Sequence, residues 1–65
     1  MISKNLKKYR IELGLSQDAL ARKADLPYST LIKLESGNRK DPRLSTLIKL
    51  ANALEISIDK LVNRK

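Results

Sequence analysis

Cationic side chains are the main chemical resource of this chain of 65 residues. It contains 14 Lys and Arg against 7 Asp and Glu, which gives a formal net charge of +7 at pH 7. Such an excess favours a polyanionic partner. The chain has no Cys and no His, which excludes disulfides, Cys/His zinc sites, thiol nucleophiles and Ser-His-Asp relays. We therefore expect a binding protein that is not an enzyme, with no cofactor, metal or small-molecule ligand.

One face of the segment 28–36 is less charged than an ordinary solvent-facing helix surface. Leu31, Leu34 and Glu35 share the inward face at helical spacing. The opposite face displays Tyr28, Ser29, Ile32, Lys33 and Ser36. A Ser hydroxyl can hydrogen-bond any base, Lys can donate to guanine O6 and N7, and an apolar group can contact a thymine methyl, so this face suits a DNA major groove. Alternatively, Tyr28 only covers the helix start and Ile32 is an isolated apolar surface residue.

Apolar residues recur at helical spacing in five segments, and no segment shows the alternation of a strand. The first expected helix runs from about residue 2 to 13, and the third from about 28 to 36. The second follows Ser16, the fourth carries the apolar residues from Leu44 to Leu54, and a short fifth follows Ser57. Ser16 and Ser57 are candidate N-caps, and glycines follow the first and third segments. The expected core stripe of the fourth helix is Leu44, Leu47, Ile48, Ala51 and Leu54, and Pro27 joins the inward stripe of the third. This predicts an all-α fold, a compact five-helix bundle forming one domain over residues 1–65.

Two short helices joined by about three residues, in a basic domain of five helices, form the geometry of a helix-turn-helix DNA reader. The residues that carry the pattern are Leu15-Ser16-Gln17-Asp18-Ala19-Leu20-Ala21, Ser29-Thr30-Leu31, Leu34-Glu35-Ser36-Gly37 and Pro42, with Leu47, Leu50-Ala51 and Ala53-Leu54 beyond. From about residue 6 to 62, the chain resembles the lambda-repressor-like family, also called the XRE or Cro type. The resemblance implies a sequence-specific transcriptional regulator of the repressor kind, which binds a two-fold operator in double-stranded DNA as a homodimer.

The resemblance also implies which side chains contact DNA. Those placed against base edges are Tyr28, Ser29, Ile32 and Lys33. Gln17 lies in the first turn of the second helix, and the resemblance implies that it bridges a phosphate and the reading helix. The full set expected at phosphates is Ser16, Gln17, Asn38, Arg39, Lys40 and Arg43. The alternatives are a solvated Gln17 and an ordinary solvated basic loop.

Two charged residues fall on faces that should be apolar, Arg10 on the first helix and Glu35 on the third. They can share the interior only as a pair, because an unpartnered buried charge costs several kcal/mol. Similar phage repressors have such a pair, which would lock these helices together; alternatively, both side chains extend to water.

Two turns depart from the family pattern. Many relatives have Gly where this chain has Asp25 and Glu55, because the residue after a helix often takes the left-handed conformation.

Other functions remain open at this point. An RNA-binding role has poor support, since the chain offers two Tyr and no Phe or Trp as stacking platforms. An antitoxin-type or protein-interaction module is favoured if the last segment exposes apolar surface, through Ile56, Ile58, Leu61 and Val62.

The chain lacks a long apolar run and a signal sequence, which predicts a cytoplasmic protein without membrane association. Because the chain ends soon after the fifth helix, we expect no effector domain and no separate oligomerisation domain.

Overall fold

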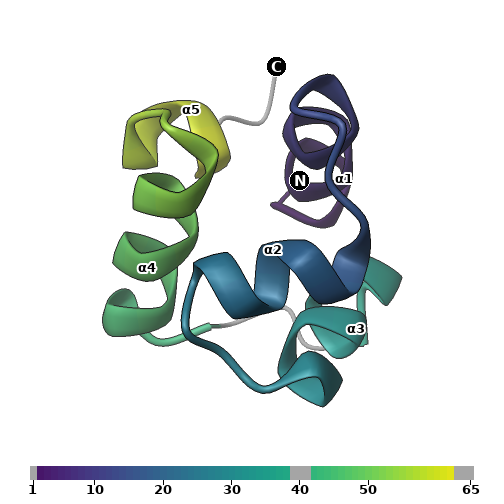
Figure 1. Cartoon of the computed structure of the whole chain (residues 1–65). Helices are drawn as coiled ribbons and strands as arrows, with labels where there is room; N and C mark the ends of the chain where they lie inside the picture. Colours follow the sequence, from purple (N-terminus) through teal and green to yellow (C-terminus); the bar gives the residue numbers. More distant parts are fainter. Residues whose placement is uncertain (1, 39–41, 63–65) are drawn as a thin grey trace.

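The computed structural model describes residues 2–38 and 42–62, and these ranges form helices and no strand (Figure 1). The five helices are α1 (Ile2–Glu12), α2 (Gln17–Lys23), α3 (Tyr28–Ser36), α4 (Leu44–Leu54) and α5 (Ile58–Val62). The all-α, five-helix prediction is confirmed; α1 ends one residue before the expected position 13, and α3 spans the expected residues 28–36. None of these helices is long and apolar enough to cross a membrane.

The core consists almost entirely of Leu and Ala, and every helix contributes to it. The largest side chains with no exposed surface or nearly none are Leu6, Leu20, Leu31, Leu34, Leu50, Leu54 and Leu61. Small residues fill the rest, at Ala21, Ala24, Ala51 and Ala53. Each fully buried Leu contributes about 1.5 to 3 kcal/mol of burial free energy relative to exposure. The helices α2 and α4, which carry most of these Ala residues, pack against each other.

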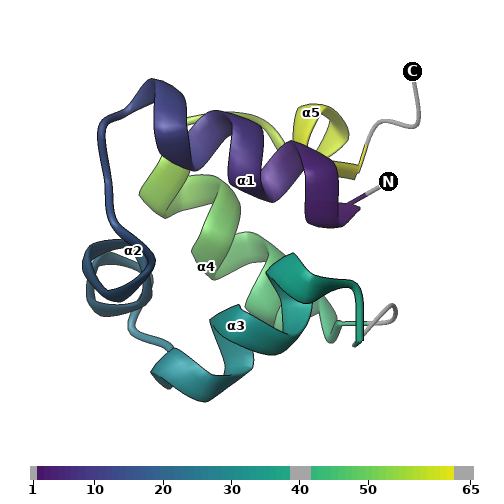
Figure 2. The same cartoon turned by 90° about the vertical axis from the view of Figure 1, so that its right-hand side faces the viewer.

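The packing order places α3 against both α1 and α2. α1 also packs on α5, and α4 packs on α2 and α5. The Asn5 side chain on α1 donates from Nδ2 to the main-chain oxygen of Leu61 at 3.0 Å, which ties the end of α5 to α1. In both views α1 lies at the upper side and α3 forms the lower edge of the domain (Figures 1 and 2). One long side of α3 is therefore left uncovered.

Three residues expected in the core lie outside it. Leu44 is 65% exposed and Ile48 is 42% exposed, because the inward side of α4 is turned toward Leu50 and Ala53, where α2 and α5 pack. Pro27 is also exposed. It is the N-cap of α3, with extended backbone at φ −60° and ψ 141°, so its side chain does not follow the helical phase.

The helix ends behave as the sequence predicted. Ser16 Oγ accepts a hydrogen bond from the Ala19 N–H at 3.0 Å, which caps α2, and Ser57 Oγ accepts from the Lys60 N–H at 3.2 Å. Asp25 and Glu55 have φ of 57° and 59°, the left-handed conformation expected after α2 and α4. A side chain at this φ costs roughly 1 kcal/mol relative to Gly.

The C-terminal segment offers little of the apolar surface that a protein-interaction module would need. Leu61 is fully buried. Ile56 and Ile58 are partly buried and pack against the core. Of the four apolar residues singled out in this segment, Val62 alone is an exposed large hydrophobic residue. The segment therefore serves mainly to close the core.

Candidate nucleic-acid interface

A tight turn sets α3 at an angle to α2. The N–H of Asp25 donates to the main-chain oxygen of Arg22 at 3.1 Å, and the N–H of Leu26 donates to that of Ala21 at 2.9 Å. These bonds end α2, and α3 begins after Pro27, whose missing N–H is tolerated at a helix start. Leu31 and Leu34 then anchor α3 to the core. This is the local geometry of the predicted helix-turn-helix pair.

The uncovered side of α3 carries the predicted base-reading residues. Tyr28 is 50% exposed, and Ser29 and Lys33 are exposed as well. Ile32 is only half-buried, so part of its side chain remains accessible for an apolar contact. Ser36 is occupied locally, since its hydroxyl donates to the main-chain oxygen of Lys33 at 3.0 Å. The face thus offers a phenol, a hydroxyl, an ammonium and an apolar group side by side.

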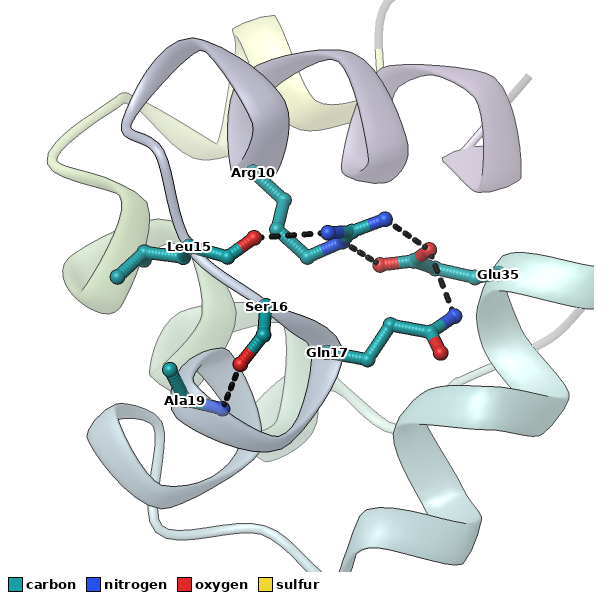
Figure 3. Close-up of polar contacts among 6 residues, drawn as sticks. All are labelled: Arg10, Leu15, Ser16, Gln17, Ala19 and Glu35. Carbon is teal, nitrogen blue, oxygen red and sulfur yellow. Dashed lines mark hydrogen bonds and ion pairs between the residues drawn. The ribbon is translucent and has the colours of Figure 1, made fainter.

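Behind this face, Arg10 and Glu35 form the expected ion pair between α1 and α3 (Figure 3). Arg10 Nε donates to Glu35 Oε2 at 2.7 Å, and Arg10 Nη2 donates to Glu35 Oε1 at 3.2 Å. The two side chains are 12% and 4% exposed. Arg10 Nη1 also donates to the main-chain oxygen of Leu15 at 2.7 Å. The guanidinium therefore joins α1, α3 and the α1–α2 connection in one network.

Gln17 belongs to the same network: it contacts the reading helix α3, as the resemblance implied, through Glu35, a partner that sequence reasoning did not name. Its Nε2 donates to Glu35 Oε1 at 3.1 Å, and the side chain is half-buried. Figure 3 shows the amide nitrogen directed at Glu35 and the amide oxygen turned away from it. The residue types could have suggested this contact, because a carboxylate accepts several hydrogen bonds. Their spacing could not, because the contact depends on how α2 crosses α3.

The remaining predicted phosphate-binding residues belong to the start of α2 and to the stretch of sequence between α3 and α4. Ser16 is exposed, and its Oγ accepts the capping bond described above, which leaves its hydroxyl hydrogen free to donate. Asn38 and Arg43 are exposed, with Arg43 as the N-cap of α4. Arg39 and Lys40 lie outside the described residues. In Figures 1 and 2, α4 starts at the level of α3.

Two cations proposed to contact DNA, Lys33 and Arg43, form no ion pair with another described residue. Among residues 2–38 and 42–62, the exposed pairs are Arg22 with Asp18 at 3.1 Å and Lys23 with Glu55 at 3.2 Å. Lys33 and Arg43 take part in neither. Both are exposed, and neither is neutralised by one of these pairs.

Comparison with known proteins agrees with this geometry. The sequence model of the family described as "Helix-turn-helix" matches residues 6–61. The "HTH-type transcriptional regulator SinR" of Bacillus licheniformis is 35% identical over 65 residues, covering 100% of this chain and 59% of that protein. This chain therefore spans little more than half the length of that relative.

Solved structures show the same fold. The crystal structure of the master regulator for biofilm formation SinR in complex with DNA superposes with a TM-score of 0.94 at 33% identity, covering 97% of this chain and 100% of that one. The N-terminal DNA-binding domain of SinR from Bacillus subtilis superposes with a TM-score of 0.95 at 34% identity, covering 100% of this chain and 94% of that one.

Proposed function

This chain belongs to the helix-turn-helix family, and on that premise we propose that it binds double-stranded DNA with sequence specificity and thereby regulates transcription. The family match covers residues 6–61, in agreement with the lambda-repressor-like resemblance in the sequence. The observation that carries the proposal is the uncovered side of α3, with mixed hydrogen-bonding and apolar groups flanked by free cations. The similarity of this chain to a protein whose crystal structure was solved in complex with DNA supports the same function. The function is binding, with no catalytic step.

In this proposal, α3 enters the major groove and reads base edges. The Lys33 ammonium donates to guanine O6 and N7, and the Ser29 hydroxyl donates to or accepts from a base. Tyr28 and Ile32 supply a phenol and an apolar contact suited to a thymine methyl. Because these side chains are not needed to fill the core, their identities are free to encode an operator sequence.

Phosphate contacts on both sides of α3 would hold the domain in register. We assign these contacts to Ser16 and Gln17 at the start of α2, and to Asn38 and Arg43, which follow α3 and precede α4 in the chain. Arg39 and Lys40 are proposed for the same role from their sequence positions. Such contacts supply affinity that does not depend on base sequence.

We further propose that the chain acts as a homodimer on a two-fold operator and represses transcription there. Half-sites one turn of DNA apart place the two reading helices about 34 Å apart. The principal extents of the domain are 26 × 22 × 19 Å, so one copy fits on each half-site, and a contact between the copies would be made by side chains at their facing ends. Leu44 and Ile48, exposed one turn apart on α4 beside Arg43, are apolar groups suited to such a contact. The protein would then work in the cytoplasm, together with its DNA.

A salt titration on selected DNA tests the proposal. Binding sites are first selected from a random duplex library, which reports the operator and its symmetry together. If about four phosphates are neutralised per monomer, the slope of log affinity against log salt is near −3.6, and roughly twice that for a dimer. A structured RNA and a scrambled duplex serve as controls. Affinity that ignores salt, or equal affinity for operator and scrambled DNA, would contradict the proposal.

A further inference from the structure

The side of α1 that points away from the core is cationic and ends in an apolar residue. Lys4, Lys7, Lys8 and Ile11 follow the spacing i, i+3, i+4 and i+7, so they share the side of the helix opposite the buried Leu6. The three lysines are exposed, and Ile11 is 57% exposed. The proposed DNA interface uses none of these four residues, which together form the outer face of α1.

The charges of this outer face are available to a partner and do not stabilise the helix itself. In the part of the chain that the structure describes, none of the three lysines forms an ion pair. The Lys8 ammonium lies 5.2 Å from the centroid of the Tyr9 ring, a contact that leaves its charge in place.

The same lysines oppose one another and the helix dipole. Acidic residues in the first turn stabilise a helix, but α1 has none there and carries Lys4 instead. Lys4 also repels Lys7 and Lys8, because residues three and four positions apart are neighbours on a helix surface. A partner that brings carboxylates to this face would relieve the repulsion.

We propose that the outer face of α1 docks an acidic amphipathic helix of a partner protein. Such a helix, lying antiparallel along α1, would present an apolar residue to Ile11 and then carboxylates to the three lysines in turn. Anchors at i, i+3, i+4 and i+7 are typical of helix recognition, and complementary charges determine register and direction. In both views α1 lies at the upper side of the domain and α3 at its lower edge (Figures 1 and 2). The docking surface is therefore separate from the uncovered side of α3.

A second copy of this chain does not supply the complementary carboxylates. Within residues 2–38 and 42–62, three acidic side chains are already paired with cations of their own chain: Asp18, Glu35 and Glu55. The other three belong to separate elements, namely α1, the α2–α3 turn and α5: Glu12, Asp25 and Asp59. The charge pattern therefore favours a different protein as the occupant.

A nucleic-acid duplex is the other polyanionic candidate for this face. Contacts to a phosphate backbone are made by positive charges and hydrogen-bond donors, so Ile11 would find no apolar counterpart there. A protein helix offers carboxylates and aliphatic groups at matching positions. The large apolar side chain in line with the cations therefore favours the helix over the duplex.

Synthetic peptides test the proposal on the free protein. The probe is a helical peptide with Leu at one position and Glu three, four and seven positions later, with Ala and Gln elsewhere. The control peptide has the same composition, but its Glu residues are spread around the helix. In nuclear magnetic resonance titrations at low salt, the probe should shift the backbone amide signals of residues 4–11. It should bind about tenfold more tightly than the control peptide, and less tightly as salt is added.

Substitutions on the outer face should weaken binding of the probe without unfolding the domain, since the residues are exposed. Combining Lys4→Gln, Lys7→Gln and Lys8→Gln should lower the affinity about tenfold, the combined scale of three exposed ion pairs. Ile11→Ala should lower it about threefold, because an apolar contact is reduced. Circular dichroism checks that each variant keeps its helices.

The matched control removes three charges from other helices. It combines Arg22→Gln, Lys23→Gln and Lys49→Gln, on α2 and α4, and should change affinity for the probe by less than about twofold. Equal losses in the two triple variants would overturn the proposal, because binding would then follow net charge alone. Amide shifts spread over the whole domain, or equal binding of the probe and the control peptide, would overturn it as well.

Operator DNA distinguishes a protein-docking face from an additional DNA-binding face. The probe and the operator should bind the domain at the same time, and mutual exclusion would overturn the proposal. If the α1 triple variant lowers the magnitude of the salt slope on operator DNA by about three units more than the matched control, the face binds phosphates instead. The peptide titrations contain no DNA, so their result does not depend on the proposed function.

Discussion

The two sides of α3 obey different physical constraints. Its inner side consists of Leu31 and Leu34, which have no exposed surface, and Glu35, whose side chain is 4% exposed. Its outer side presents Tyr28 and Lys33 to solvent. The inner residues must match the volume and charge of their neighbours in the domain. The outer residues are exposed and are not needed to fill the core. A substitution there can therefore alter DNA binding while the fold persists.

The largest expected effect is on the inner side, for Glu35→Ala. This substitution leaves Arg10 mostly buried without its partner, and we expect the free energy of unfolding to fall by roughly 3 kcal/mol. Denaturant unfolding followed by circular dichroism measures it. A loss below about 0.5 kcal/mol would show that the pair contributes no more than a surface pair.

On the outer side, Lys33→Ala should change DNA recognition and leave the fold intact. Removing the donor to a guanine should weaken binding to the best operator by about 1 to 3 kcal/mol, with far less loss on random DNA. Unfolding free energy should stay within about 0.5 kcal/mol of the original value, as for most surface changes. Titrations of the variant and the original chain against operator and scrambled duplexes measure both changes in affinity. Equal weakening on both duplexes would remove Lys33 from the base-reading set.

Arg43→Ala should weaken all DNA sequences about equally. Its side chain stands at the start of α4, where we propose that it binds a phosphate and no base. The salt slope should lose about one unit of magnitude per monomer. Affinity for operator and scrambled duplexes is compared at several salt concentrations. A shift in the preferred base would contradict the assignment.

The smallest expected effect concerns an ion pair outside α3. Lys23 and Glu55 are 42% and 69% exposed in their side chains, and their pair spans 3.2 Å. Because water screens exposed charges, Lys23→Ala should lower the unfolding free energy by less than about 1 kcal/mol. Measured beside Glu35→Ala, it isolates the contribution of burial to the strength of an ion pair. Equal losses for the two variants would refute the distinction between the inner side of α3 and the exposed surface.

Local signals predicted most of the fold. Helix periods, Ser caps and the residues after α2 and α4 depend on near neighbours in the chain, and Ser16, Asp25 and Glu55 occur as predicted. The core stripe of α4 was partly wrong, at Leu44 and Ile48. Periodicity identifies an apolar side of a helix but not its rotation about the axis. That rotation is determined by which helices pack against it, here α2 and α5.

For the interface, the sequence by itself determined the kinds of chemistry available: an excess of cations, no catalytic Cys or His, and a weakly charged side on the third helix. It also predicted the pairing of Arg10 with Glu35, since two opposite charges on apolar faces need each other. Only the tertiary structure decided that Gln17 joins them through Glu35 Oε1. That bond depends on the crossing of α2 over α3, and a crossing is set by side chains distant in sequence that pack together in the core.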